Sequence, residues 1–156
     1  VNVRMLGSYL SENSRTNSTG VKTSSEGGFG LPDWNYQLSG SYNRGPLGIN
    51  LQARYTAETL QSLTNNIYQA GFNGGAVRYD VAYNTIDASV IVDSRVSYNF
   101  DYKGGNISLF ANVNNLFDED PQEFYGALSG FSQAVGDGHT GDKRGRRYVV
   151  GFRFDY

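Results

Sequence analysis

The sequence predicts an all-β fold, an antiparallel up-and-down transmembrane β-barrel to which this chain contributes about six strands. Three observations predict it. Apolar and polar residues alternate with period two in several segments, which puts the two kinds on opposite faces of a strand. Long and short connections alternate between these segments. Aromatic residues make up 14% of the chain, yet its mean hydropathy is −0.48, as expected for a sheet with one wet face.

Composition excludes several classes of function. The 13 Lys and Arg residues are outnumbered by 15 Asp and Glu residues, so the chain offers no polybasic surface for nucleic acid. The absence of Cys excludes disulfides, thiolate metal sites and a Cys nucleophile. No apolar run approaches the length of a transmembrane helix, which leaves a closed barrel as the only membrane-spanning architecture. Because the sequence opens at Val1 without a signal peptide, we expect a piece of a longer polypeptide.

The first three strands are expected over residues 1–11, 33–43 and 47–57. Polar residues fill most of the positions between their alternating apolar residues. The sequence Arg44-Gly45-Pro46-Leu47 predicts a tight turn between the second and the third strand. The apolar set comprises Val1, Val3, Met5 and Tyr9, then Trp34, Tyr36, Leu38 and Tyr42, then Leu47, Ile49, Leu51, Ala53 and Tyr55.

The last three strands are expected over residues 90–102, 106–117 and 146–156. Lys103-Gly104-Gly105 predicts the second short turn. In the final strand every even position from Tyr148 to Tyr156 is aromatic or aliphatic. The apolar set of the three strands comprises Val90, Val92, Val96, Tyr98, Phe100 and Tyr102, then Ile107, Leu109, Ala111 and Val113, then Tyr148, Val150, Phe152, Phe154 and Tyr156.

Connection lengths and charges favour a membrane barrel. Residues 12–32, 59–89 and 118–145 form long connections on one side of the sheet, and the two short turns lie on the other. Outer-membrane barrels show this asymmetry, whereas soluble sheets favour short connections at both ends. A cation facing lipid at mid-bilayer costs roughly 2–4 kcal/mol. The strand charges accordingly share the parity of the polar set: Arg4, Arg54, Asp93, Arg95, Asp101, Arg147, Arg153 and Asp155.

Aromatic residues gather at both ends of the apolar set, as expected for side chains at two membrane interfaces. The loop-end group is Tyr9, Trp34, Tyr36, Tyr55, Phe117 and Tyr148, and the turn-end group is Tyr42, Tyr98, Phe100, Tyr102, Phe154 and Tyr156. Four apolar residues break the pattern, either because they pack against something inside the barrel or because the register shifts locally by one residue: Leu6, Ile91, Phe110 and Val149. A soluble sheet with one buried face is the alternative fold.

The penultimate strand carries a sequence with a family resemblance. Val113-Asn114-Asn115-Leu116-Phe117-Asp118, followed by Pro121, resembles the penultimate strand of TonB-dependent outer-membrane receptors. Gly145-Arg146-Arg147-Tyr148 with Gly151-Phe152-Arg153-Phe154 resembles the final strand of that family. Residues 32–34, 42–46 and 93–98 resemble its preceding strands, so the match is densest over residues 90–156.

The resemblance implies that residues 1–156 are the C-terminal segment of a 22-stranded barrel, without the plug domain and the energy-coupling segment. It implies neither an enzyme nor a cofactor. It implies active uptake of a scarce solute (iron siderophore, cobalamin or oligosaccharide) across the bacterial outer membrane, with a periplasmic C-terminus. The implied partners are outer-membrane lipid and lipopolysaccharide, the barrel-assembly machinery, the plug, TonB and the small-molecule solute. The alternative is a passive porin fragment or a subunit of an oligomeric barrel, which would lack a plug domain.

Two groups of residues are candidates for function. An aromatic-terminated last strand resembles the signal read by the barrel-assembly machinery, here Tyr148, Val150, Phe152, Phe154 and Tyr156. Loop aromatics can stack on sugars or catecholate rings, or else pack the loops together; these are Tyr68, Phe72, Tyr79, Tyr83, Phe124, Tyr125 and Phe131. No metal site is predicted, because His139, the one histidine, lies among loop glycines where a solvated side chain is expected.

Overall fold

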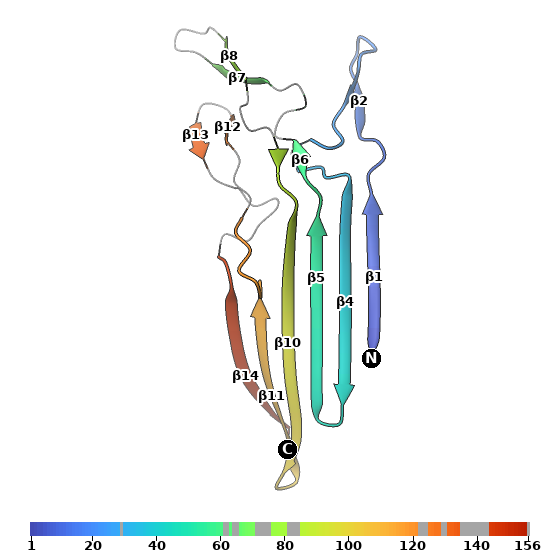
Figure 1. Cartoon of the computed structure of the whole chain (residues 1–156), viewed down its shortest axis with the longest axis vertical. Coiled ribbons are helices and arrows are strands. Elements are labelled where there is room, and N and C mark those ends of the chain that lie inside the picture. Colours follow the sequence, from blue (N-terminus) through green and yellow to red (C-terminus); the bar gives the residue numbers. More distant parts are fainter. Residues whose placement is uncertain are drawn as a thin grey trace.

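A computed structural model describes residues 1–28, 30–60, 63, 66–70, 76–80, 85–121, 125–128, 131–134 and 144–155, with the backbone alone for 66–70, 76–80, 125–128 and 131–134. Its main feature is one antiparallel sheet of six long strands that follow one another in sequence order (Figure 1). They are β1 (Asn2–Tyr9), β4 (Trp34–Arg44), β5 (Leu47–Thr56), β10 (Ser89–Tyr102), β11 (Gly105–Asn114) and β14 (Arg147–Asp155). The prediction of an all-β, antiparallel chain with six long strands is confirmed.

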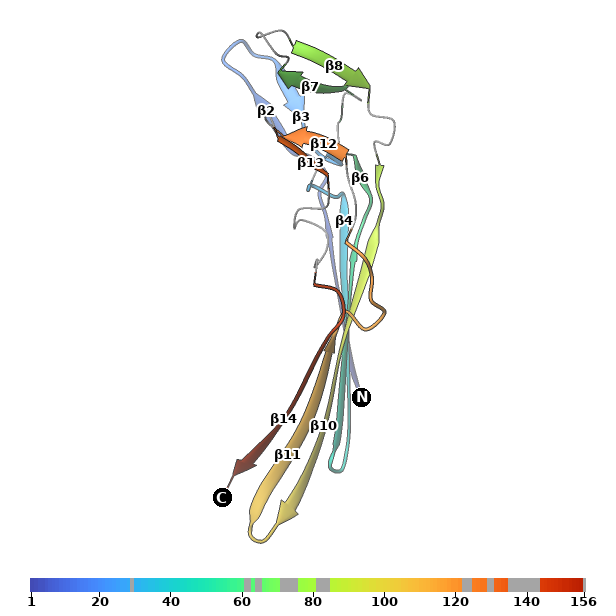
Figure 2. The ribbon, with the colours of Figure 1, turned by 90° about the vertical axis from the view of Figure 1, so that its left-hand side faces the viewer.

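The long connections contain short two-stranded sheets that the sequence did not predict. They gather at one end of the main sheet, and the two tight turns lie at the opposite end (Figures 1 and 2). The pairs are β2 (Ser14–Thr16) with β3 (Lys22–Ser24), β6 (Thr59–Leu60) with β9 (Thr85–Ile86), β7 (Asn66–Ala70) with β8 (Ala76–Asp80), and β12 (Tyr125–Leu128) with β13 (Phe131–Ala134). The predicted asymmetry between the two ends is therefore present.

The register of the sheet keeps apolar and polar residues on separate faces. One row of paired residues runs Met5–Leu38–Ala53–Val92, and another runs Tyr42–Ile49–Val96–Ala111–Val150. The row next to the first, Arg4–Ser39–Gln52–Asp93, belongs to the polar face because alternate residues of a strand point to opposite sides. We call these two sides the apolar face and the polar face.

The four exceptions to the pattern lie on the polar face, and the register is not shifted. Leu6 pairs with Gln37, and Ile91 pairs with Arg54, both members of a polar row. Val149 pairs with Asn112. Phe110 pairs with Gly151, and its ring lies over that glycine: a Cβ at position 151 would meet Phe110 Cζ at 2.5 Å. A glycine at 151 thus makes room for an aromatic ring on the polar face.

The sheet has almost no core of its own. Among the residues whose side chains are described, Ile86, in the short strand β9, is the one buried hydrophobic residue, at 3% exposure. On β14, Val150 is 80% exposed and Phe152 is 76% exposed. The sheet is curled and open, with β1 and β14 as its two edges (Figure 2). A soluble sheet buries one face against a second layer, and no second layer covers the apolar face in the described residues.

Candidate functional site

The apolar face ends in a strip of aromatic rings on the loop side. The rings of Tyr9 and Trp34 lie 4.4 Å apart between centroids, and Trp34 and Tyr36 stack at 5.5 Å with an interplanar angle of 12°. Tyr36 and Tyr55 follow at 5.8 Å. This strip crosses β1, β4 and β5 without a break, and its phenol and indole groups lie where an apolar surface meets water.

The turn side carries the second band. The rings of Tyr98 and Phe100 lie 6.2 Å apart on β10, and Lys103 Nζ lies 5.3 Å from the centroid of the Tyr102 ring. Between the two bands the apolar face carries mostly aliphatic and small residues, Leu38, Ala53 and Val92 among them. The strand residues of the two predicted aromatic groups thus occupy opposite ends of one face, whereas Phe117 follows the end of β11 and Tyr156 lies outside the described residues.

Charges within the six strands avoid the apolar face. Of the charged strand residues, Arg44 alone shares the parity of the apolar set, and it is the last residue of β4, next to the turn. A long side chain at that position can extend its guanidinium away from an apolar surface. The remaining strand charges all lie on the polar face, as the sequence predicts.

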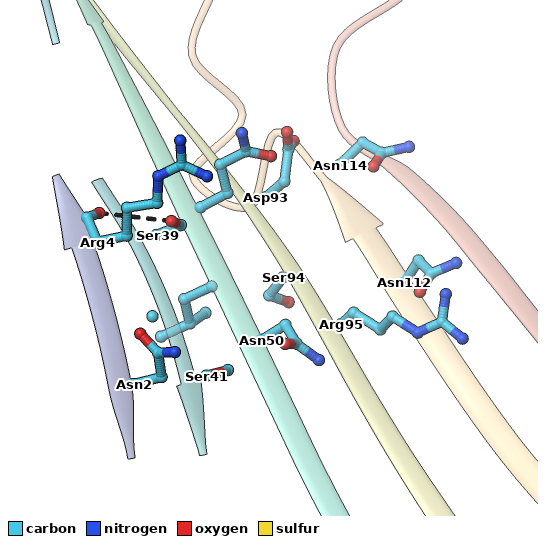
Figure 3. A pocket seen from close by; sticks show the side chains of 13 residues that line it. Asn2, Arg4, Ser39, Ser41, Asn50, Asp93, Ser94, Arg95, Asn112 and Asn114 are labelled. Carbon is cyan, nitrogen blue, oxygen red and sulfur yellow. Dashed lines mark hydrogen bonds between the residues drawn. The ribbon is translucent and has the colours of Figure 1, made fainter. Parts of the chain in front are cut away.

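The polar face is hollowed into an open depression of about 580 Å³ across the middle of the sheet (Figure 3). Arg4 of β1 and Arg95 of β10 lie on two sides of it, and amide and hydroxyl side chains lie between them. Arg54 Nη2 and Asp93 Oδ2 form an ion pair at 2.8 Å between β5 and β10. The Arg95 guanidinium lies 5.2 Å from the centroid of the Phe110 ring. The depression is therefore polar, basic and open to water.

A compact set of hydrogen bonds fixes the point where β11 leaves the sheet. We call residues 115–119 together with Arg146 the loop corner. Asp93 Oδ1 accepts a hydrogen bond from the Asn115 amide at 3.0 Å, and the Leu116 amide donates to the Val92 carbonyl at 2.7 Å. The Asn115 side chain accepts from the Glu119 amide at 2.8 Å and donates to the Glu119 carbonyl at 2.9 Å. Asn115 is 3% exposed and has a φ of 56°.

Asp118 ties the loop corner to the start of β14. Its Oδ1 accepts from the Arg146 amide at 2.7 Å, and its Oδ2 lies 3.5 Å from Arg146 Nη2. Arg146 Nη1 also donates to the Leu116 carbonyl at 3.3 Å. Asn and Asp tolerate a positive φ better than other residues with side chains, and Asp118 has a φ of 59°. The turn thus explains why Asn and Asp occupy positions 115 and 118, since both residues have a positive φ and both side chains accept hydrogen bonds there.

The hairpin of β2 and β3 carries a pair of exposed acidic side chains with lowered pKa values. The Ser24 hydroxyl donates to the Glu26 carboxylate and, with the backbone amides of Glu26 and Asn13, lowers its pKa from 4.5 to about 2. Lys22 forms an ion pair with Glu12 and lowers the pKa of Glu12, with a smaller effect from Ser14. These bonds hold the two ends of the hairpin together.

The stability of this hairpin is expected to depend on pH in an acid window. Since the pKa of Glu26 is lower in the closed hairpin than its ordinary value of 4.5, the contribution is present above about pH 4.5 and is lost as the pH falls towards about 2. Amide protection factors at Ser25, which donates to the Asn13 carbonyl at 2.7 Å, are expected to fall in that window. The Glu26→Gln variant should lack this part of the pH dependence. A loss of protection that is complete above pH 5 would contradict the assignment.

The predicted site residues fall into two regions. Tyr148, Val150, Phe152 and Phe154 lie on the apolar face of β14 and are all exposed, whereas Tyr156 lies outside the described residues. Among the candidate solute contacts, Tyr68, Tyr79, Tyr125 and Phe131 lie on β7, β8, β12 and β13, and β7 approaches β12. Phe72, Tyr83, Phe124 and His139 lie outside the described residues.

Two kinds of feature are absent from the described residues. They contain no group of three or more His, Cys, Asp or Glu side chains placed to hold a metal ion. Within the same part of the chain, no helix is long and apolar enough to cross a membrane.

The described residues thus form an open antiparallel sheet, one face of which is apolar, exposed and bounded by two aromatic bands. The chain matches no family model, and no curated protein and no solved structure matches it.

Proposed function

We propose that this chain is the C-terminal part of a TonB-dependent receptor barrel that takes up a scarce solute across a bacterial outer membrane. The observation that carries the proposal is the exposed apolar face, bounded by aromatic bands and free of strand charges except for Arg44 next to the turn. Lipid covers such a face without a second protein layer. On this proposal the aromatic bands lie at the two interfaces, next to phospholipid on one side and lipopolysaccharide on the other.

The free-energy cost of leaving this face in water supports a membrane location. Burying one large apolar side chain is worth about 1.5–3 kcal/mol. Leu38, Leu51, Val96, Leu109, Val150 and Phe152 are each between 42% and 80% exposed on the same side of one sheet. A contiguous apolar surface of this extent marks a protein or membrane contact. The two interfacial bands and the grouping of all long connections at one end favour the membrane.

The open edges support a larger barrel. β1 and β14 each have a neighbour on one side only, and bacterial single-chain barrels need at least about eight strands. On this proposal, strands supplied by the rest of the receptor pair with both edges and close a 22-stranded barrel. The polar face then lines the lumen, where the plug domain lies. The loop corner also supports the proposal. Asn115 and Asp118 belong to the sequence that resembles the penultimate strand of the family, and their side chains form the hydrogen bonds of this turn.

Energy dependence of uptake separates the receptor from a passive porin. Cells that lack the full-length gene are expected to lose uptake of one scarce solute, to be found by growth on limiting iron chelates, cobalamin or oligosaccharides. A protonophore is expected to abolish that uptake in wild-type cells, because the family couples transport to the inner-membrane proton gradient through TonB. Uptake that continues at the same initial rate with the protonophore would support the porin.

Deletion of Tyr156 is expected to cripple assembly of the receptor in cells. On this proposal Tyr156 continues the alternation of Tyr148, Val150, Phe152 and Phe154, a pattern that resembles the signal read by the barrel-assembly machinery. The measurement is the amount of the receptor in the outer-membrane fraction, with Asp155→Asn as a matched control on the opposite face. Normal insertion without Tyr156 would remove the assembly-signal interpretation.

A further inference from the structure

Two cations lie at the turn end of the apolar face. Arg44 is the last residue of β4 and shares the parity of the apolar set. Lys103 lies in the turn between β10 and β11, and its Nζ lies 5.3 Å from the centroid of the Tyr102 ring. Tyr102 belongs to the apolar face and is 51% exposed, so the Lys103 ammonium lies on that side of the sheet. We call Arg44 and Lys103 the turn-end cations.

The carboxylates at this end lie on the opposite face and are already bound. Asp101 accepts a hydrogen bond from the Asn106 side chain at 3.3 Å, and Asp155 is held by Arg153 at 3.0 Å. Both acids have the parity of the polar face. Among the described residues, no carboxylate lies within ion-pair distance of either turn-end cation, and both cations are exposed. The acids of this end therefore leave the two cations to an external anion.

The loop end of the same face differs in this respect. Arg146 lies 5.9 Å from the centroid of the Tyr148 ring, much as Lys103 lies near Tyr102. Its guanidinium, however, also lies 3.5 Å from the Asp118 carboxylate. Arg146 thus serves the loop corner, whereas the turn-end cations make no such contact within the described part of the chain.

The backbone at Lys103 adds a second observation. Lys103 and Gly104 form the two-residue loop of the β10–β11 hairpin, with φ values of 48° and 87°. A hairpin loop with positive φ at both residues strongly favours Asn or Asp followed by Gly, because these short polar side chains hydrogen-bond locally in a left-handed conformation. Lys is therefore an unfavourable residue for the turn itself. A function of the ammonium group accounts for its position better than the turn does.

Both aromatic bands slope across the sheet in the same sense. In the loop-side band, Tyr148 on β14 shares a row with Gly40, four residues nearer the turns than Tyr36 of β4. The turn-side band shows the same shift between Tyr42 on β4 and Phe154 on β14. Four residues span about 13 Å, and the four strand spacings from β4 to β14 span about 19 Å. The bands thus indicate strands inclined by about 35° to the normal of the apolar layer, as in membrane barrels.

This slope brings the turn-end cations to nearly one level. Arg44 shares a row with Tyr98, and Lys103 lies five residues beyond Tyr98, where β10 extends past the β4–β5 turn (Figure 1). The slope accounts for about two of these residues, which leaves roughly 8 Å along the normal. That distance is similar to the headgroup layer of a bilayer, roughly 5–8 Å thick on each side. The Lys103 side chain folds back over Tyr102, and Arg44 can extend away from the apolar surface, so both charges reach one headgroup layer.

We propose that Arg44 and Lys103 bind the phosphate groups of anionic phospholipids in the periplasmic leaflet of the outer membrane. The inference rests on the proposed function, in which lipid covers the apolar face and the turns are periplasmic, and it names the lipid class at the turn end. Two strand spacings, about 10 Å, separate the cations across the sheet, so each meets a separate phosphate through charge-assisted hydrogen bonds. A headgroup with net negative charge is favoured, because it brings no ammonium group of its own to neutralise the phosphate.

Local labelling of lysine amines tests the proposal in the full-length receptor. The receptor is placed in nanodiscs of phosphatidylcholine, with or without phosphatidylglycerol, so that both sides of the membrane are open to reagent. A water-soluble acetylating ester modifies free amines, and mass spectrometry gives the rate at each lysine. The rate at Lys103 is expected to fall about fivefold with phosphatidylglycerol, the change that corresponds to the usual attraction of one basic residue to an anionic leaflet. Arg44→Lys reports on position 44 in the same way.

Arg153→Lys is the matched control for both positions. It places an amine at the same end of the sheet but on the polar face, next to Asp155. The general potential of an anionic membrane acts there too, but no lipid headgroup touches that face on this proposal. The labelling rate at position 153 should therefore change little between the two nanodiscs.

The outcomes separate this inference from the proposed function. A receptor that is found in the outer membrane and shifts on boiling, but whose Lys103 reacts equally fast in both nanodiscs, overturns the phospholipid contact and leaves the proposed function intact. An equal fall at positions 103 and 153 would overturn the contact as well, since the membrane potential alone explains it. Equal protection of Lys103 by inorganic phosphate in phosphatidylcholine nanodiscs would assign the cations to free phosphate instead. A receptor absent from the outer membrane would overturn the proposed function itself.

Discussion

Replacement of Leu51 by Arg is expected to block insertion of the receptor into the outer membrane. Leu51 is 48% exposed on the apolar face of β5, between Gly40 of β4 and Ser94 of β10. A guanidinium facing lipid near the middle of the bilayer costs roughly 2–4 kcal/mol. The amount of receptor in the outer-membrane fraction, and its mobility shift on boiling, measure the effect.

The neighbouring residue supplies the control for this prediction. Gln52 lies on the polar face, where it pairs with Ser39 and with Asp93. Gln52→Arg places the same charge one residue away, on the wet face and next to a carboxylate, and it should assemble as wild type does. Equal tolerance of the two arginines would contradict the assignment of the apolar face to lipid.

Asn115→Ala is expected to lower the free energy of unfolding by about 3 kcal/mol. The substitution removes both hydrogen bonds between the Asn115 side chain and Glu119, each worth about 1 kcal/mol. It also leaves Ala at a φ of 56°, a backbone conformation that costs about 1 kcal/mol or more without glycine or asparagine. The temperature at which the receptor loses its folded, fast-migrating form on a gel measures the loss.

Asn115→Gly separates the two contributions. Glycine adopts a positive φ without strain, so this variant loses the hydrogen bonds alone and should be more stable than Asn115→Ala. Because the loop corner also orients Asp118 towards Arg146, both variants should increase amide exchange at Arg146. If the Ala and Gly variants unfold at the wild-type temperature, the loop corner does not stabilise the end of the barrel.

The six long strands could be predicted because apolar and polar residues alternate along each of them with period two. Their ends were less predictable. The fifth strand was expected to continue to Phe117, but β11 ends at Asn114. The prediction is wrong here because Asn115 has a positive φ, which ends the extended backbone of the strand. Its side chain accepts a hydrogen bond from the Glu119 amide, which fixes the turn. Alternation of apolar residues carries no signal for such a turn, although the adjacent Asn and Asp residues do.

The short hairpins were missed for a related reason. β2 and β3 are three residues each, too short for a pattern of alternation. The turn between them is held by Asn17, whose Oδ1 accepts from the amides of Thr19 and Val21, and by Gly20 at a φ of 81°. An Asn followed by Ser, Thr and Gly is a turn signal, and reading it would have predicted this hairpin.

The residues of the polar face could be placed by parity, but their partners could not. The sequence puts Arg54 and Asp93 on one face, whereas their ion pair depends on the register between β5 and β10, which are separated in the sequence by a long connection. The hydrogen bond from Asn115 to Asp93 likewise depends on the register of β11. The basic character of the depression follows from these pairings, since they commit the one carboxylate and leave two arginines.

The most direct test of the account is the size and heat behaviour of the native polypeptide that contains these residues. Outer-membrane extracts, unheated and boiled, are run on a gel and probed with an antibody to residues 118–145. The account predicts a band several times heavier than 17.2 kDa that migrates faster before boiling than after it, as a large closed barrel does. A native chain of about 17.2 kDa, or a band in the soluble fraction, would contradict the assignment of this sheet to a receptor barrel.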